Sequence, residues 1–205
     1  MYTGIVQAQL PISGVEKKDG MTTFSLEFPD HLMGGLESGA SIAVNGVCFT
    51  VTGISGRKIS FEAIRESLAL SNIKYLEVGS MVNVERSAKH DAEIGGHVLS
   101  GHVINTATVS HIEVSENNCR MTLTGDSAWL KYVFDKGFLG VNGASLTVAK
   151  LDREANSLCI NLIPETLKRT NFSLLNVGDE VNIEIESQTQ VIVDTVERVL
   201  AERHQ

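Results

Sequence analysis

The sequence predicts an all-β protein in which two similar small domains follow one another and a single helix ends the chain. Three observations support this prediction. Blocks of sequence recur about a hundred residues apart, short strand-like runs fill both copies, and the C-terminal segment changes to helical spacing of its apolar residues. A chain of 205 residues has room for two domains of about 100 residues each.

The repeat consists of three blocks in the same order. Residues 41–51 (SIAVNGVCFTV) align with residues 138–148 (FLGVNGASLTV) at a shift of 97 positions, with five identities in eleven pairs. Residues 66–85 align with residues 165–184 at a shift of 99, with nine identities in twenty. The first shift also lays the early segment Thr-Gly-Ile-Val over Ser-Gly-His-Val after residue 99. Copies of this length can fold alone, unlike the short units of a solenoid. The predicted boundaries are 1–96, 97–186 and a helical segment at 187–205.

Within each copy, short runs rich in Val, Ile, Thr and Phe are separated by Gly, Asn and Asp, as antiparallel strands are. Many short strands at close spacing favour a small barrel or sandwich over βαβ units. Residues 66–73 and 165–172 are typical of single helical turns between strands, and the polar residues 87–97 are the predicted linker. The clearest strand candidates in the first copy are residues 21–28 (MTTFSLEF), 41–51, 58–64 (KISFEAI) and 81–86 (MVNVER).

The C-terminal segment has the pattern of an amphipathic helix. Ile192, Val196, Val199 and Leu200 recur at helical spacing, and Ser187 can begin the helix. Two interpretations stay open on the pattern alone. The helix could pack on its own domain, or its narrow apolar stripe could join copies of the chain.

Composition excludes several classes of function. Seventeen Lys and Arg against 25 Asp and Glu give a net charge of −8, which repels nucleic acid and anionic membranes. The chain shows neither a leader pattern nor 18 consecutive apolar residues, so we expect a soluble cytoplasmic protein. Three widely spaced cysteines, Cys48, Cys119 and Cys159, argue against disulfides and zinc, and most of them are expected to be buried, reduced thiols.

The familiar catalytic motifs are absent. The sequence contains no P-loop, no dinucleotide-binding glycine pattern, no H-E-x-x-H and no complete G-x-S-x-G elbow. His97 and His102, with His90 or Glu93, match no compact metal-binding spacing, so no metal is expected. A flavin or nicotinamide oxidoreductase is disfavoured because no phosphate-binding loop is present.

What remains is a set of paired positions, one in each copy. Glycine and asparagine after a strand are common in turns, and threonine suits strands, so many of these pairs need no function. Cys48 is the informative member, because a hydroxyl, Ser145, stands at the equivalent place. This suggests two related pockets with different reactive atoms. The pairs are Gly4/Gly101, Asn45/Asn142, Cys48/Ser145, Thr50/Thr147, Glu66/Glu165 and Ser67/Thr166.

At these residues the chain resembles the riboflavin synthase family along its whole length. The resemblance rests on the N-terminal Met-Tyr-Thr-Gly-Ile-Val, the blocks Asn-Gly-x-Cys-x-Thr-Val and Asn-Gly-x-Ser-Leu-Thr-Val, Ile94-Gly-Gly-His97 with Ser100-Gly-His102, Ile163-Pro-Glu-Thr-Leu, and Gln188-Thr-Gln before the final helix. It implies two six-stranded antiparallel Greek-key barrels in tandem and a C-terminal helix that assembles homotrimers, with the active site between barrels of adjacent subunits.

The resemblance also implies the reaction. Two molecules of 6,7-dimethyl-8-ribityllumazine dismutate by transfer of a four-carbon unit, giving riboflavin and 5-amino-6-ribitylamino-uracil without a cofactor. This is the last step of riboflavin biosynthesis, and lumazine synthase is a candidate partner. Two similar pockets suit a reaction between two identical molecules, because each pocket can take a different role.

The chemistry requires removal of a proton from the C7 methyl of one molecule and addition of a nucleophile at C7 of the other. His102 is the first candidate for the proton transfer and His97 the second, although a structural role for His97 is equally compatible with the sequence. Cys48 could supply a thiolate or a hydrogen bond. Orientation of two large ligands can contribute roughly 7 to 11 kcal/mol. The remaining catalytic candidates, which could hydrogen-bond the ring or activate water, are Ser41, Ser145 and Thr147.

By the same resemblance, a larger set of residues lines the two ligand sites. It comprises Gly4, Ile5, Val6, Cys48, Phe49, Thr50, Glu62, Ala63, Ile64, Arg65, Glu66, Ser67, Gly101, His102, Val103, Lys136, Ser145, Leu146, Thr147, Asn161, Leu162, Ile163, Pro164, Glu165 and Thr166.

Three departures from the family pattern stand out. Tyr2 replaces the usual Phe and adds a hydroxyl to a ring that can still stack. Asn142 stands where relatives often carry Asp, and a carboxamide cannot be a general base. Because Asn45 holds the equivalent place, we expect a turn or hydrogen-bonding role for Asn142. Ser67 and Ser71 replace threonines, a mild change.

The main alternative is a non-catalytic relative that binds a lumazine or flavin as a fluorescent antenna. Such a protein needs one good pocket and can lose the other. Here both copies keep their hydroxyl, thiol and imidazole groups, and Lys136 is present, which favours the enzyme. A purely structural module would leave the paired polar positions unexplained.

Overall fold

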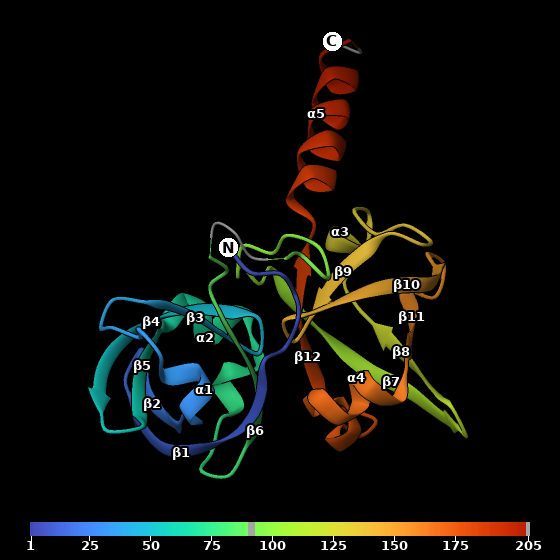
Figure 1. Cartoon of the computed structure of the whole chain (residues 1–205). Coiled ribbons are helices and arrows are strands. Elements are labelled where there is room, and N and C mark those ends of the chain that lie inside the picture. The colour runs from blue at the N-terminus through green and yellow to red at the C-terminus, as the bar shows by residue number, and fades with distance from the viewer. Residues whose placement is uncertain (90–92, 204–205) are drawn as a thin grey trace.

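Two closed antiparallel β-barrels lie side by side in the computed structural model, which describes residues 1–89 and 93–203 (Figure 1). Each barrel has six strands, and the C-terminal helix projects away from both of them. The predicted fold of two tandem barrels followed by a helix is confirmed. The predicted linker at 87–97 lies partly outside the described residues.

The first barrel closes in the strand order β1-β2-β5-β4-β3-β6. Its elements are β1 (Ala8–Lys18), β2 (Met21–Glu27), α1 (Asp30–Met33), β3 (Ser41–Val44), β4 (Val47–Ser55), β5 (Lys58–Ile64), α2 (Arg65–Leu70), the 3₁₀ turn η1 (Asn72–Tyr75) and β6 (Met81–Arg86).

The second barrel repeats this order as β7-β8-β11-β10-β9-β12 around the closed ring. Its elements are β7 (Asn105–Ser115), β8 (Asn118–Thr124), α3 (Ser127–Leu130), β9 (Phe138–Val141), β10 (Ala144–Asp152), β11 (Ser157–Leu162), α4 (Pro164–Arg169), η2 (Asn171–Leu174) and β12 (Glu180–Ile185). The C-terminal helix is α5 (Ser187–Arg203).

Alternating burial along the strands produces the two cores. In β5, for example, Ile59, Phe61 and Ala63 are buried while their neighbours face outward, as the two-residue period of a strand requires. Each barrel encloses its own continuous apolar cluster. The first core contains more phenylalanine than the second. Two of its rings, Phe24 and Phe49, meet edge to face with ring centroids 5.1 Å apart.

Equivalent tight hairpins connect β3 to β4 and β9 to β10. Asn45 and Gly46 have φ values of 46° and 81°, and Asn142 and Gly143 have 43° and 78°. Positive φ at both central residues defines the turn whose twist matches that of antiparallel strands, and Asn-Gly is its preferred sequence. The two turns touch each other, since a Cβ added to Gly46 would lie 2.6 Å from the Gly143 backbone nitrogen. These glycines therefore set how closely the barrels approach.

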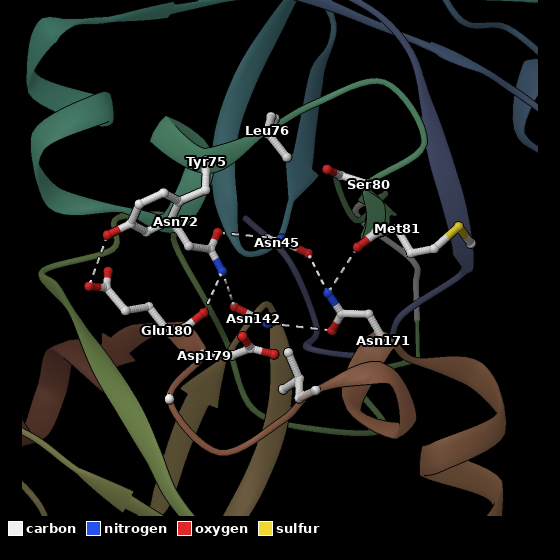
Figure 2. Close-up of a pocket in the computed structure, with 12 residues that line it drawn as sticks. Asn45, Asn72, Tyr75, Leu76, Ser80, Met81, Asn142, Asn171, Asp179 and Glu180 are labelled. Atoms are coloured by element: carbon white, nitrogen blue, oxygen red, sulfur yellow. Dashed lines mark hydrogen bonds between the residues drawn. The ribbon is translucent and has the colours of Figure 1, made fainter.

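Six asparagines, one set of three from each barrel, connect the two barrels through hydrogen bonds. Figure 2 shows Asn45, Asn72, Asn142 and Asn171 of this set. Asn182 Nδ2 donates to the Asn45 carbonyl oxygen at 2.8 Å. The equivalent bond runs from Asn83 Nδ2 to the Asn142 carbonyl oxygen at 2.9 Å. Every member thus has a counterpart in the other half, which makes the interface nearly twofold symmetric. The full set, called the asparagine network below, is Asn45, Asn72, Asn83, Asn142, Asn171 and Asn182.

The network also explains Asn142. Its side chain is fully buried, and its Oδ1 accepts hydrogen bonds from the Asn182 backbone N–H at 2.8 Å and from Asn72 Nδ2 at 3.1 Å. An ionised carboxylate at this position could not donate a hydrogen bond to Asn171 Oδ1, as Asn142 Nδ2 does. The expected hydrogen-bonding role of Asn142 is confirmed.

Helix α5 begins at Ser187 as predicted and has no buried residue. Two residues of the second barrel contact the middle of the helix: Tyr132 Oη donates to Asp194 at 2.6 Å, and Lys131 Nζ donates to Glu197 at 2.6 Å. The contacts of α5 with its own domain are therefore polar ones, and its apolar stripe does not pack there. Its apolar stripe is exposed at Val191, Ile192, Val196, Val199 and Leu200.

The cysteines differ in part from expectation. All three are free thiols, but only Cys119 is buried. Cys48 and Cys159 are half-buried because their side chains lie on the outward faces of β4 and β11. Burial raises the pKa of the Cys119 thiol.

Candidate functional site

The segment that precedes each barrel crosses to the other half, where it lies against the opposite hairpin. Tyr2 and Leu99, which are equivalent in the repeat, pair across the pseudo-twofold axis through backbone bonds of 2.8 and 3.0 Å. Beyond them, the Gly4 carbonyl oxygen accepts from the Ser145 N–H at 2.8 Å, and the Gly101 carbonyl oxygen accepts from the Cys48 N–H at 2.9 Å. Each half thus completes a wall of the other's pocket.

A buried glutamate holds each crossing segment. The Glu85 carboxylate accepts bonds from the Thr3 N–H, the Thr3 hydroxyl and the Gly4 N–H at 2.6, 2.8 and 3.1 Å. Glu184 does the same for Ser100 and Gly101. Burial raises the pKa of the Glu85 carboxyl, while the bonds from Thr3 and Gly4 oppose that shift.

The first pocket lies between the first barrel and the crossing segment of the second half. Its volume is about 360 Å³. Cys48 and His102 bring a thiol and an imidazole to it, and Glu66 on α2 brings a carboxylate. The lining consists of Val47, Cys48, Glu66, Ser67, Leu70, Ser71, Gly101, His102 and Val103.

The second pocket is its counterpart in the second barrel, with a volume of about 380 Å³. Ser145 replaces Cys48, Ile5 replaces His102 and Arg169 replaces Leu70. The lining consists of Gly4, Ile5, Val6, Ala144, Ser145, Leu146, Glu165, Thr166, Arg169 and Thr170. The pairing predicted from the repeat therefore corresponds to two separate but equivalent pockets.

The equivalent atoms Cys48 Sγ and Ser145 Oγ have unlike partners. Tyr2 Oη donates to Cys48 Sγ at 3.0 Å, and burial followed by this bond raises the pKa of the Tyr2 phenol. His97 Nδ1 lies 2.6 Å from Ser145 Oγ. Leu99, the counterpart of Tyr2, carries no hydroxyl. The two pockets differ in their supporting groups as well as in their reactive atoms.

His97 is buried, with 8% of its surface exposed, and its ring stacks on Phe138 at a centroid distance of 5.3 Å. Burial lowers its pKa, although the charge of Glu186 acts in the opposite direction. The loop that carries it passes close to Ser145, since a Cβ at Gly96 would lie 2.3 Å from the Thr3 carbonyl oxygen and 2.7 Å from Ser145 Cβ. Only glycine fits there.

The lowered pKa of His97 predicts a pH-dependent stability. The unfolded chain binds the proton more tightly than the folded one, so stability is full above the ordinary value of 6.5 and declines as the pH falls below it. We expect His97→Asn, which cannot titrate, to reduce the fall in melting temperature between pH 7.5 and pH 5. The exposed His111 provides the control, His111→Asn. Equal acid sensitivity in the wild type and both variants would contradict this expectation.

Further predicted residues face outward from the barrels but line neither pocket. Thr50 and Thr147 lie two residues beyond Cys48 and Ser145, so their side chains share the same faces. The remaining outward-facing candidates are Ser41, Glu62, Ile64 and Arg65 in the first half and Asn161, Ile163 and Pro164 in the second.

Four other predicted residues are placed differently. The side chains of Phe49, Ala63 and Leu162 lie in the barrel cores, so these residues can offer a ligand only their backbone. Lys136 is exposed at a left-handed φ of 66° and lines neither pocket.

The pockets also include residues that the sequence analysis missed. Leu70 and Ser71, the last residue and the C-cap of α2, follow Glu66 and Ser67 by four positions, and Arg169 and Thr170 are their equivalents at the end of α4. Helical spacing could have identified them, because residues four apart share a helix face. Val47 and Ala144, which begin β4 and β10, complete the missed set.

Among the described residues, no group of three or more His, Cys, Asp or Glu side chains is placed to hold a metal ion. His90 lies outside them. No helix in the described part of the chain is long and apolar enough to cross a membrane.

Comparison with known proteins gives a consistent result. The family described as "Lumazine binding domain" matches twice, at residues 3–87 and 100–186. The riboflavin synthase of Escherichia coli (strain K12) is 48% identical over 204 residues, which cover 99% of this chain and 95% of that protein. That of Chlamydia pneumoniae is 37% identical over 98% of both chains.

Solved structures of similar fold come from LumP. The complex with riboflavin has a TM-score of 0.84 and 26% identity and covers 91% of this chain and 100% of that one. The complex with 6,7-dimethyl-8-(1'-D-ribityl) lumazine has a TM-score of 0.80 and 28% identity and covers 90% of this chain and 98% of the other.

Proposed function

This chain belongs to the riboflavin synthase family, and we propose that it converts two molecules of 6,7-dimethyl-8-ribityllumazine into riboflavin and 5-amino-6-ribitylamino-uracil. One molecule donates a four-carbon unit to the other. The observation that carries the proposal is the presence of two equivalent pockets of about 360 and 380 Å³ that keep different reactive side chains. An antenna protein needs only one of them.

Each pocket supplies groups suited to its half of the reaction. In the first pocket, His102 serves proton transfer and Cys48 supplies a thiol at C7 of its ligand or a hydrogen bond to the ring. In the second pocket, Ser145 with His97 supplies a supported hydroxyl. Ser41, Thr50 and Thr147 act at the rims. The reaction uses no cofactor and no metal, because the ring itself delocalises the charge.

Holding two rings in register accounts for most of the rate in this proposal. The active site forms where the first pocket of one subunit meets the second pocket of a neighbour. The chain therefore works as a homotrimer joined through α5, whose apolar stripe is exposed in the single chain. Lumazine synthase, a cytoplasmic location and the domain boundaries at residues 96 and 186 stay predictions.

The direct test of the proposal uses the purified full chain and 6,7-dimethyl-8-ribityllumazine, with chelator present and no added cofactor. Riboflavin is expected to accumulate, with one molecule formed for every two consumed, and its absorbance band measures it. A chain that binds lumazine tightly but forms no riboflavin would establish the antenna alternative instead.

Truncation after Glu186 tests the assembly. The barrels bury no side chain of α5, so the shortened chain is expected to fold, with an unchanged β-type circular dichroism spectrum. Because the truncation removes the exposed apolar stripe that is proposed to join the subunits, light scattering is expected to show monomers. The point variant Ile192→Glu is expected to weaken the assembly in the same direction. An intact trimer from the shortened chain would show that the barrels hold it together.

A further inference from the structure

The proposed reaction begins with two identical molecules that must take different roles, and the two pockets differ in how well they can hold negative charge. We propose that the second pocket binds the lumazine that has lost its C7-methyl proton, and that His97 is the positioning residue that keeps the Ser145 hydroxyl donating to that anion. This inference rests on the proposed function and assigns the roles of its two sites.

The first step of the argument is the direction of the bond between His97 and Ser145. The Nε2 atom of His97 is buried and has no hydrogen-bond partner within residues 1–89 and 93–203. A buried N–H without an acceptor is more costly and rarer than a buried acceptor without a donor. The proton of the neutral ring therefore lies on Nδ1, which donates to Ser145 Oγ across 2.6 Å.

The consequence concerns the hydroxyl hydrogen of Ser145. Its oxygen is already an acceptor for His97, so its O–H is left to donate, and Ser145 lines the second pocket. A hydroxyl donor favours a ligand that carries negative charge on its ring oxygens or nitrogens. Cys48 also accepts a bond, from Tyr2, but its S–H is a weak donor.

The charged residues that line the two pockets also favour an anion in the second pocket. Glu165 and Arg169 of α4 form an ion pair at the second pocket, so their charges cancel. At the first pocket Leu70 stands in place of Arg169, and the lining contains no Lys or Arg beside Glu66. Arg65, the neighbour of Glu66 on α2, pairs with Asp19 instead. Among the carboxylate and guanidinium groups of the two linings, the first pocket therefore has an uncompensated negative charge and the second has none. The negative charge of Glu186 acts to raise the pKa of His97, but Glu186 lines neither pocket.

Ionisation of the ligand is simple in chemical terms. In the titration described below, one C–H bond of the C7 methyl breaks, the added base takes the proton, and the electron pair is delocalised over the ring. The absorbance spectrum of the ligand changes with this charge, so its state can be measured while it is bound. Neither pocket needs to form a covalent bond for this measurement.

The experiment uses variants in which one pocket is filled, because a single occupied pocket cannot support turnover. Ser67→Phe fills the first pocket and Thr166→Phe fills the second, from equivalent half-buried positions. The lumazine is titrated with base in each variant. In Ser67→Phe, the acid dissociation constant of the bound ligand is expected to rise about tenfold, one pH unit, above that of the free ligand. In Thr166→Phe it is expected to stay at or below the free value.

Variants of His97 in the Ser67→Phe background test whether the hydrogen bond that His97 donates to Ser145 is needed for the shift in the acidity of the bound ligand. His97→Asn keeps an N–H near the position of Nδ1 and is expected to retain the shift. His97→Ala and Ser145→Ala are expected to lose it. The inference is overturned if His97→Ala leaves the shift intact, if His97→Asn loses it as His97→Ala does, or if the shift appears in Thr166→Phe instead.

Two further arrangements keep the test decisive. If Ser67→Phe fails to fold, the same absorbance change is read by rapid mixing of the full unmodified chain and its His97 variants with lumazine, before the first turnover. Failure of the proposed function is separate, since it shows as absence of lumazine binding or of riboflavin in the unmodified chain. A chain that makes riboflavin but shows no shift in either filled variant overturns this inference alone.

Discussion

Replacing Glu184 by alanine is expected to weaken ligand binding in the first pocket at least tenfold and to leave the second pocket in place. The carboxylate accepts three short bonds from Ser100 and Gly101, and Gly101 forms part of the first pocket's wall. Each buried donor left without an acceptor costs about 1–3 kcal/mol. We expect a loss of about 2–4 kcal/mol in the free energy of unfolding and at least tenfold weaker binding, since about 1.4 kcal/mol is tenfold.

Glu85→Ala provides the matched experiment, because Glu85 holds Gly4, a wall of the second pocket. Titration calorimetry with lumazine is expected to give one site per chain for either variant and two for the wild type. Riboflavin formation is expected to fall at least a hundredfold in both variants, because the reaction requires both pockets. Glu27→Ala, at an exposed glutamate, is the control. Two sites of wild-type affinity in Glu184→Ala would refute the role of the carboxylate.

Substitution within the asparagine network is expected to destabilise the pair of barrels. Asn182 is 1% exposed; its Nδ2 donates to the Asn45 carbonyl oxygen, and its Oδ1 accepts from the Asn72 N–H at 2.6 Å. Asn182→Ala leaves both partners without their bonds, and we expect a loss of about 2–4 kcal/mol from the free energy of unfolding. Urea denaturation measures it.

The near-twofold symmetry makes this prediction more demanding. Asn83→Ala removes the equivalent bonds to Asn142 and Asn171, so the two variants are expected to agree within about 0.5 kcal/mol. Asn118→Ala, at the start of β8, is expected to change stability by less than about 0.5 kcal/mol. If Asn182→Ala is as stable as this control, the network does not hold the barrels together.

Much of the architecture could be predicted from the sequence because it depends on local pattern. The repeat identified two equivalent barrels, and alternation located most of the strand-forming segments of the first barrel. The strand expected over residues 41–51 is instead two strands, β3 and β4, because positive φ at Asn45 and Gly46 reverses the chain in a tight hairpin. β1 is harder to identify, because Pro11 and Gly14 interrupt its pattern and its register shifts between Ile12 and Gly14. The helical spacing of apolar residues predicted helix α5, but it did not show whether the apolar side chains of α5 are buried or exposed.

The paired positions predicted that Cys48 and Ser145 mark equivalent sites, since a repeat aligns residues that share an environment. Only the tertiary structure decided what each meets, because Tyr2 lies 46 positions from Cys48 and His97 lies 48 positions from Ser145. Such contacts depend on how the crossing segments pack, which no local propensity specifies. The sequence therefore determined two alike barrels with two alike pockets, and the fold gave one pocket a thiol held by a phenol and the other a hydroxyl held by a buried imidazole.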